Sequence, residues 1–312
     1  NSGYSQGTRL LRQPAISATQ IVFEYGGDIW TSAKSGGTAI RITSTAAVES
    51  NPHFSPDGKW IAFSSNRSGI AQVYVVASVG GAPTQLTWYP SAASARGFTP
   101  DGKESLFSSG RESAPTGYGR LWKVPVKGGP SELLPAPWGF DGRYAPDGKK
   151  LVIDRVSRWD SEWRHYRGGQ NTPLQILDLK TLAEEDIPTD GSEDIHPIWL
   201  SNEIFFLSDR GFIMNVWSYD VSTKAVRQVT NFTNGDVKWL EGNGNELIIE
   251  QDGYLHIVDP IYGKTTQLNI SVIGDFPWAE TRLENVTDEI ASASLSPTGK
   301  RILVEARGEI FT

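Results

Sequence analysis

Short apolar runs separated by polar turn residues recur along the whole chain. The stretch 51–69, NPHFSPDGKWIAFSSNRSG, shows the pattern: an apolar segment, a Pro-Asp-Gly turn, and a second apolar segment closed by polar residues. Proline sets φ at the first corner of a turn and glycine adopts the positive φ that completes the reversal, so the phrase predicts a β-hairpin. Related phrases return at 97–111 and 143–155, which indicates an internal repeat.

The repeat can be aligned on the large apolar residue that precedes each turn. Six such residues lie roughly 40–56 positions apart: Phe54, Phe98, Tyr144, Trp199, Trp239 and Leu295. The intervals also hold further runs of strand composition, so a complete unit has four strands in about 40–50 residues. This pattern predicts an all-β fold, a β-propeller of four-stranded antiparallel blades. A cruder copy at 14–43 brings the number of complete units to six, so six blades are favoured.

The last unit contains only three of the four expected strands. The predicted organisation is therefore an N-terminal extension (1–13), a six-bladed propeller (14–270), a linker (271–289) and the truncated start of a following propeller (290–312). In the alternative, residues 8–12 supply the missing strand of the last unit and make a seventh blade. Six blades can close without that strand, because the first unit has four strands of its own.

Composition and charge argue against several classes of partner. The net charge of −7 and the pI near 5.2 provide no basic field for nucleic acid. No apolar run approaches the ~20 residues that span a bilayer. We therefore expect neither a nucleic-acid nor a membrane partner. Cysteine is absent, which removes disulfides, thiolate nucleophiles and cysteine metal sites.

Motifs for catalysis are also missing. The sequence has no G-x-S-x-G, no H-E-x-x-H and no Walker loop. The recurrent Asp-Gly pairs are explained by turn geometry rather than by metal binding. We predict that this chain contains no catalytic residue, no metal site and no cofactor.

Polar residues gather on the predicted innermost strands, which surround the axis of a propeller. They are predicted to line a solvated axial channel: Asn51, His53, Arg96, Asp141, Arg143, His196, Asp236 and Lys238. Two interpretations stay open. The residues either solvate a channel that any propeller has, or they meet a peptide or partner at its mouth.

The connection between the second and third strands of the fourth unit is longer than its counterparts, with aromatic residues interleaved among arginines. Guanidinium groups pair with carboxylates and stack on rings, so the segment is a candidate for binding a peptide or partner. The candidate residues are Arg158, Trp159, Trp163, Arg164, His165, Tyr166 and Arg167. In the alternative, the aromatic residues pack the loop onto the propeller and the arginines pair with Asp154, Asp160 and Glu162.

Several phrases resemble the N-terminal propeller of bacterial tricorn-type serine peptidases. The more specific ones are RHYRGG at 164–169, HPIWL at 196–200 and LSDR at 207–210, whereas the SPDGK turn is shared with TolB and other propellers. The resemblance covers residues 7–312. It implies a non-catalytic domain of an oligomeric peptidase that trims oligopeptides. The implied partners are oligopeptides, downstream domains of the same polypeptide and further copies of the protein.

The predicted function is to guide or filter oligopeptides and to support assembly of such a peptidase. The alternative is a stand-alone, TolB-like periplasmic scaffold that binds proteins at the propeller faces. Bacterial members of the tricorn-type peptidase family commonly begin with a signal peptide just before a segment like GTRLLRQP, so the resemblance implies that the polar start NSGYSQGTR is the mature N-terminus of an exported protein. We therefore expect a periplasmic or secreted location, with the cytoplasm as the alternative.

Overall fold

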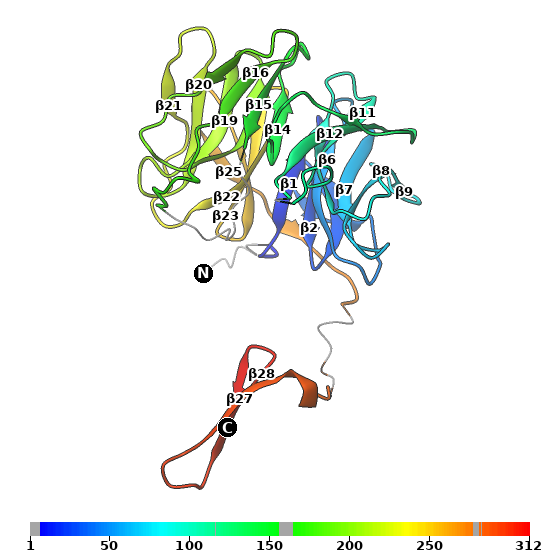
Figure 1. Ribbon diagram of the computed structural model, residues 1–312, viewed down its shortest axis with the longest axis vertical. Coiled ribbons are helices and arrows are strands. Elements are labelled where there is room, and N and C mark those ends of the chain that lie inside the picture. Colours follow the sequence, from blue (N-terminus) through cyan, green and yellow to red (C-terminus); the bar gives the residue numbers. More distant parts are fainter. Residues whose placement is uncertain (1–6, 116, 156–164, 277–280, 282) are drawn as a thin grey trace. The chain divides into compact units, whose positions relative to one another are not determined.

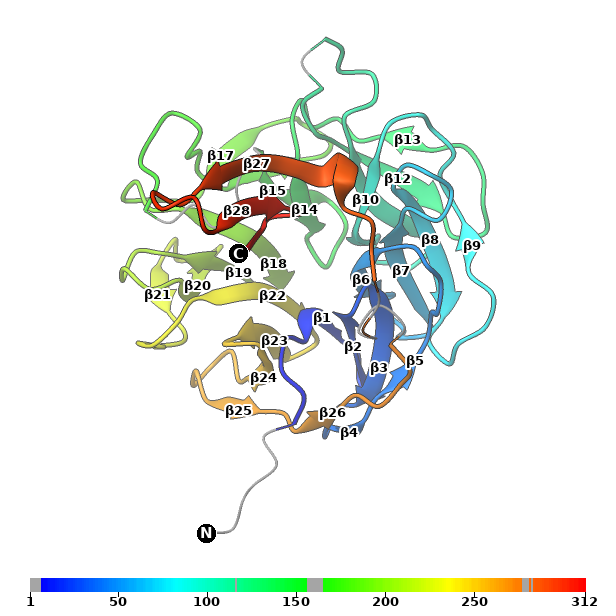
Figure 2. The same ribbon diagram turned by 90° about the horizontal axis from the view of Figure 1, so that it is seen from below.

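The computed structural model describes residues 7–115, 117–155, 165–276, 281 and 283–312. In this part of the chain the strands form six four-stranded antiparallel sheets around a common axis, a two-stranded parallel sheet and a three-stranded sheet (Figure 1, Figure 2). The fold is a β-propeller of four-stranded antiparallel blades, as the repeat predicts.

Each blade uses consecutive strands, and the first strand of each lies innermost. The first blade contains β1 (Arg12–Ile16), β2 (Gln20–Tyr25), β3 (Asp28–Ala33) and β5 (Ile40–Arg41). The second contains β6 (Glu49–Phe54), β7 (Trp60–Ser65), β8 (Gln72–Ala77) and β9 (Thr84–Gln85). The third contains β10 (Ala93–Phe98), β11 (Glu104–Ser109), β12 (Arg120–Pro125) and β13 (Glu132–Leu133).

The remaining three blades follow the same order. The fourth contains β14 (Asp141–Tyr144), β15 (Lys150–Asp154), β16 (Gln175–Asp178) and β17 (Glu184–Asp186). The fifth contains β18 (Asp194–Leu200), β19 (Glu203–Ser208), β20 (Asn215–Asp220) and β21 (Val226–Gln228). The sixth contains β22 (Val237–Asn243), β23 (Glu246–Gln251), β24 (Tyr254–Val258) and β25 (Thr265–Gln267).

The core lies between neighbouring blades. One apolar cluster joins Phe205 and Val216 of the fifth blade to Leu240 and Leu247 of the sixth. Because both faces of a blade are covered by its neighbours, the strand middles read as continuous apolar runs rather than as alternating ones. This explains why segments such as IAF at 61–63 and LII at 247–249 carry the repeat signal.

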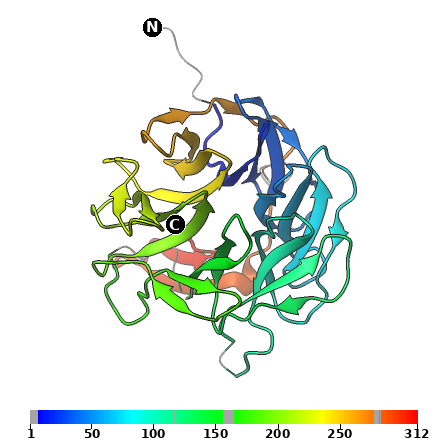
Figure 3. The ribbon, with the colours of Figure 1, turned by 90° about the horizontal axis from the view of Figure 1, so that it is seen from above.

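The ring closes between the sixth and first blades (Figure 3). There, β26 (Ile270–Ser271) pairs in parallel with β4 (Gly37–Thr38), and the Thr8 amide donates to the Ile270 carbonyl at 2.7 Å. The Leu11 amide donates to the carbonyl of Gly253 in the sixth blade at 3.3 Å, and the Leu11 side chain is buried. Residues 8–11 therefore join the first blade to the sixth.

The chain divides into two compact units, Asn1–Ile273 and Gly274–Thr312. The second unit contains a 3₁₀ turn, η2 (Thr287–Glu289), and the sheet β27 (Ile290–Leu295), β28 (Ile302–Ala306) and β29 (Glu309–Phe311). Whether 290–312 opens a following propeller or belongs to a seventh blade stays a prediction. Within the described residues, no helix is long and apolar enough to cross a membrane.

Candidate functional site

The innermost strands bring one residue from each blade to a common level of the axis. Each of these residues pairs with the third residue of the second strand of its own blade. They are Ala15, His53, Gly97, Arg143, Ile198 and Glu241. Three of these residues are small or apolar. The axis therefore has room at this level for the three polar side chains.

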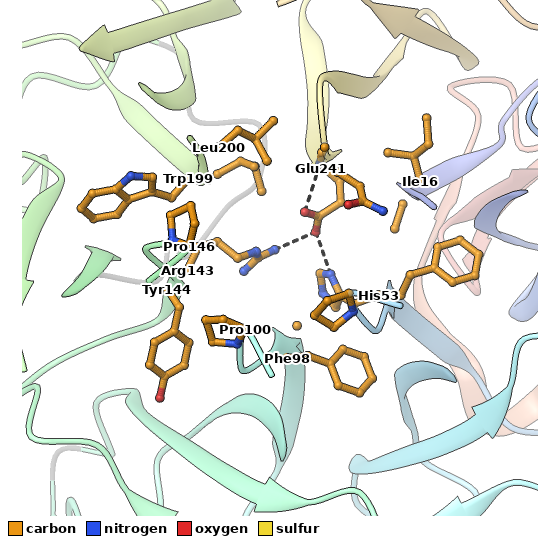
Figure 4. A pocket seen from close by; sticks show the side chains of 18 of the residues that line it. Ile16, His53, Phe98, Pro100, Arg143, Tyr144, Pro146, Trp199, Leu200 and Glu241 are labelled. Carbon is orange, nitrogen blue, oxygen red and sulfur yellow. Dashed lines mark hydrogen bonds and ion pairs between the residues drawn. The ribbon is translucent and has the colours of Figure 1, made fainter. Parts of the chain in front are cut away.

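His53, Arg143 and Glu241 meet at one carboxylate oxygen (Figure 4). Nδ1 of His53 lies 2.7 Å from Oε2 of Glu241, and Nη2 of Arg143 donates to the same oxygen at 2.9 Å. The three side chains are only 3%, 12% and 10% exposed. Because they come from the second, fourth and sixth blades, which alternate around the ring, these bonds cross the axis. The buried network closes the axis at this level.

A second carboxylate, that of Asp141, extends the network. Nη1 of Arg143 donates to Oδ1 of Asp141 at 2.8 Å, and Nδ1 of His196 lies 3.4 Å from Oδ2 of Asp141. Arg96 of the third blade is also buried; its guanidinium stacks on Phe140 at 4.3 Å and its Nε donates to a serine hydroxyl. The network and this arginine thus draw on five of the six blades.

Burial and charge together set the ionisation of this network. Burial opposes ionisation of Glu241, but the charge of Arg143 and the hydrogen bond from His53 outweigh it and lower the pKa of Glu241 to about 2. Burial is likewise overcome at Asp141, where Arg143 and His196 hold the pKa far below its usual value. Burial lowers the pKa of His53 by more than Glu241 raises it. At neutral pH His53 is therefore uncharged, and its Nδ1–H donates to Glu241.

Strained backbone recurs beside the axis. Gln13, Asn51 and His196 have φ of 49°, 51° and 49°, and each lies at a β-bulge in the innermost strand of its blade. Such bulges bend a strand and redirect its side chains. Oε1 of Gln13 accepts a hydrogen bond from the Asn51 amide of the second blade at 2.7 Å. His196 of the fifth blade likewise lies beside Asp141 of the fourth. The bulges thus tie adjacent blades together around the axis.

A cavity of about 400 Å³ lies at the end of the axis where turns follow the innermost strands, which we call the turn end. Its inner end is formed by His53, Arg143 and Glu241 (Figure 4). Apolar residues also line it, among them Ile16, Phe98 and Leu200, whereas Trp199, Phe54 and Tyr144 border it but pack into the apolar clusters between blades. A concave site that combines apolar surface with a few convergent polar groups is typical of ligand sites. We call this cavity the axial pocket.

The residues predicted to line a channel fall into two groups. The structure brings together His53, Arg96, Asp141, Arg143 and His196. These side chains are mostly buried, whereas a solvated channel was expected. The other three lie outside this network: Asn51 at the bulge of β6, Asp236 accepting a hydrogen bond from the Met214 amide at 3.0 Å, and Lys238 exposed on β22. Any role of these residues in binding stays a prediction.

Sequence reasoning missed Glu241 because the repeat was aligned on Trp239. In the structure β22 continues to Asn243, and Gly242 pairs with Leu247 as Phe54 pairs with Ile61. The turn of the sixth blade is shorter than the Pro-Asp-Gly turns, so the aligned aromatic residue lies earlier on the strand. If the repeat is aligned instead on the second strand of each blade, LII at 247–249 in the sixth, Glu241 occupies the position that His53 occupies in the second blade.

The long connection of the fourth blade lies partly outside the described residues, including Arg158, Trp159, Trp163 and Arg164. Of its described part, Arg167 forms a bidentate pair with Asp209 of the fifth blade, at 3.0 and 3.1 Å. The His165 amide donates to the same carboxylate at 3.0 Å, and the His165 ring stacks on Phe212 at 4.2 Å. Tyr166 contributes its carbonyl, which accepts from Asn171 at 3.1 Å. The described end of the loop is therefore packed onto the next blade.

Metal ligands are not gathered anywhere in the described ranges, where no group of three or more His, Asp or Glu side chains is placed to hold an ion. The chain does match a known protein family. The model of the tricorn protease N-terminal β-propeller domain matches residues 8–264. The chain belongs to this family.

Other tricorn N-terminal propellers occur in much longer proteins. A tricorn protease homologue of Saccharolobus solfataricus is 26% identical over 304 residues, which cover 96% of this chain and 28% of the relative. The tricorn protease of Thermoplasma acidophilum is 25% identical over 314 residues, which cover 97% of this chain and 28% of the relative. The chain thus spans less than a third of the length of these curated relatives.

Solved structures agree with the family assignment. The crystal structure of the tricorn protease matches with a TM-score of 0.80 and 25% identity, over 97% of this chain and 30% of that one. TolB from Acinetobacter baumannii matches with a TM-score of 0.53 and 23% identity, over 70% of this chain and 53% of that one. The second likeness concerns the fold alone.

Proposed function

We propose that this propeller is a non-catalytic domain of a tricorn-type serine peptidase, and that it captures oligopeptides in its axial pocket for cleavage elsewhere in the assembly. Family membership supports the link to a peptidase, because the relatives are tricorn proteases or their homologues. The observation that carries the binding role is the axial pocket itself, which combines apolar surface with convergent polar groups at its inner end.

The chemistry of the pocket fits a peptide. The apolar part of the lining takes up an aliphatic or aromatic side chain, and a small set of polar groups orients the backbone. In the buried network, the charges of Asp141 and Glu241 balance those of Arg96 and Arg143, while His53 is neutral. The inner end therefore favours a neutral peptide backbone over a strongly charged group.

The closed axis defines how the domain filters. Since buried side chains cross the axis at Glu241, a peptide that enters from the turn end stops at the network. The domain on this account retains peptides with suitable apolar residues rather than conducting every peptide through its centre. Its further partners are downstream domains of the same polypeptide and other copies of the protein, and its location is the periplasm or the cell exterior.

A stand-alone scaffold of the TolB type is the second candidate, favoured by the shared fold. The two functions differ in ligand, because the scaffold binds folded proteins at the propeller faces. Incubating the chain with the tryptic peptides of a denatured protein, followed by ultrafiltration and mass spectrometry, separates them. We expect retention of a subset rich in apolar residues and no newly cut peptides.

Two results contradict the proposal. If no peptide is retained while folded periplasmic proteins are, the scaffold is the better account. If peptides are cut, and substitution of one serine of this chain abolishes the cutting, the domain is catalytic.

A further inference from the structure

Three blades carry an arginine two residues after the end of their second strand: Arg67, Arg111 and Arg210. In the second blade, Arg67 pairs with Glu49, the first residue of β6. In the fifth, Arg210 pairs with Asp194, the first residue of β18, at 2.7 Å. Both carboxylates are buried, so the pair is a repeated internal contact of the blades.

The third blade keeps the arginine but lacks the acid. Its first residue is Ala93, which pairs with Ser109 just as Glu49 pairs with Ser65 and Asp194 with Ser208. Among the residues that the structure describes, Nε and Nη1 of Arg111 have no hydrogen-bond partner. Within the described residues, therefore, no acceptor takes the place at these two nitrogens of the acid that the other two blades provide.

The serine of the motif also behaves differently. Ser65 and Ser208 accept hydrogen bonds from the arginine Nε of their blades, at 3.0 and 3.2 Å. In the third blade the Ser109 hydroxyl donates instead to the Ala92 carbonyl at 2.7 Å. The Arg111 guanidinium has thus lost both polar contacts that its counterparts make.

Arg111 is nevertheless only 5% exposed. Its guanidinium lies between two rings, 3.7 Å from the centre of Tyr89 and 3.5 Å from that of Trp122, and burial lowers its pKa. Ring faces attract a cation but satisfy none of its in-plane N–H donors. The adjacent Glu112 and the Tyr89 hydroxyl attract the charge, but neither gives Nε or Nη1 a hydrogen-bond partner, and buried donors without partners are costly. Tyr89 is partly exposed and covers the guanidinium on one side.

Exposed aromatic residues occur in the loops at the same end of the blades as Arg111. Trp88 precedes Tyr89 in the loop before β10, and Tyr118 contacts Trp138 at 5.7 Å between the neighbouring loops. These residues follow or precede the strands at the end of the blade opposite the Pro-Asp-Gly turns, and none of them lines the axial pocket. Exposed tryptophan and tyrosine beside arginine are the residues most enriched at binding hot spots.

We propose that Arg111 binds a carboxylate of an oligopeptide, which takes the place that Glu49 and Asp194 occupy in the other blades. Tyr89 moves aside to admit it, and the aromatic loop residues contact the rest of the peptide. A carboxylate pairs with a guanidinium through two parallel hydrogen bonds, which supplies the missing acceptors. The choice of a peptide rests on the proposed function; the need for a carboxylate rests on the comparison of blades.

The test uses three acetylated tripeptides and equilibrium titration with the full chain. Phe-Glu-Phe-amide carries a side-chain carboxylate, Phe-Gln-Phe with a free C-terminus carries a terminal one, and Phe-Gln-Phe-amide carries none. We expect at least one of the first two to bind about 10-fold or more tightly than the neutral peptide, as a charge-assisted pair requires. The stronger of the two identifies the source of the carboxylate.

The decisive variant is Ala93→Glu, which supplies internally the acid that the second blade has at Glu49. It is expected to abolish the preference for a carboxylate and to raise the unfolding temperature, because the internal acid then pairs with Arg111. Arg111→Met should also abolish the preference. Ser94→Glu adds the same charge one residue along, on the opposite face of the strand, and is expected to keep the preference.

Two outcomes overturn the proposal. One is equal binding of all three peptides by the unsubstituted chain. The other is a carboxylate preference that survives Ala93→Glu with the fold intact by circular dichroism. Binding of the neutral peptide reports on the axial pocket, so loss of the Arg111 site alone leaves the proposed function standing.

Discussion

Glu241 joins three blades through a single side chain. One oxygen accepts from His53 and Arg143, and Oε1 accepts from the Gly242 amide at 3.1 Å. Removing one partner of a buried ion pair leaves the other charge uncompensated, which makes such a change far more costly than loss of a surface pair.

Glu241→Gln is accordingly expected to lower the free energy of unfolding at neutral pH by about 3–5 kcal/mol. The matched control is Glu246→Gln in the same blade, because Glu246 pairs with Lys34 at the surface and is 37% exposed. That change should cost less than about 1 kcal/mol. Urea unfolding of both variants checks the difference, and equal losses would show that the axial network contributes no more than a surface pair.

The same residue predicts a dependence on pH. The pKa of Glu241 is about 2 in the fold against 4.5 for an unperturbed glutamate, so the unfolded chain binds the proton more readily as pH falls. Its stabilising contribution is therefore complete above pH 4.5 and is lost as pH falls toward about 2. Over that range Glu241→Gln should lose less stability than the unsubstituted chain. Parallel pH profiles for the two would contradict the assignment.

Individual residues were predictable where the signal is local. His53 and Arg143 were recognised because each lies just before a Pro-Asp-Gly turn that fixes its register. Glu241 lacks such a turn, and its role depends on two blades that are distant in the sequence. The same limit applies to Asp209, which meets Arg167 only because adjacent blades bring them together. The sequence alone did not show that the third blade lacks an acid for Arg111, because the strand pairing is needed to align Ala93 with Glu49 and Asp194.

Strands and turns follow closely from local chemistry. In the second blade, Asp57 accepts from the Ser55 hydroxyl at 2.7 Å and from the Lys59 amide at 3.1 Å, and Gly58 has φ of 70°. The same arrangement recurs at Asp101, whose pKa these hydrogen bonds lower to about 2. The hydrogen bonds that hold these turns are therefore local in the sequence. The fourth strands are shorter than the sequence indicated, at two or three paired residues, because their outer edge has no partner strand.

Closure of the ring depends on the segment that leads into β1. Leu11 is 1% exposed between the first and sixth blades, while its neighbour Leu10 is 60% exposed. Leu11→Ala should lower the free energy of unfolding by about 2–5 kcal/mol, and Leu10→Ala by less than about 0.5 kcal/mol. Thermal and urea unfolding of the two variants test this. Similar stabilities for both would mean that the segment does not help to close the ring.

The whole chain consists of two units, and the first contains its own core. The apolar clusters of the propeller draw on residues between Ala15 and Val258, whereas every residue of β27 in the second unit is exposed. A chain ending at Ile273 is therefore expected to unfold at the same temperature as the full chain, by calorimetry. A clearly lower temperature would show that residues 274–312 stabilise the propeller.

The repeat predicted the architecture of the molecule because every blade restates the same local pattern. It did not predict that the axis is closed, since closure comes from three single residues that differ between blades. That closure is what turns a channel into the axial pocket, and the account of function depends on it.

The most direct test of that account is peptide retention by a chain whose axial pocket is filled. Asn243 lines the pocket at the end of β22, so Asn243→Trp places an indole in the cavity. Lys103→Trp adds the same side chain on an exposed turn residue outside the pocket. Both variants are made in an Arg111→Met chain, which removes the second proposed peptide site. With the tryptic peptide pool, we predict that retention is lost in Asn243→Trp and kept in Lys103→Trp. Undiminished retention by a folded Asn243→Trp chain would contradict the claim that the pocket binds oligopeptides.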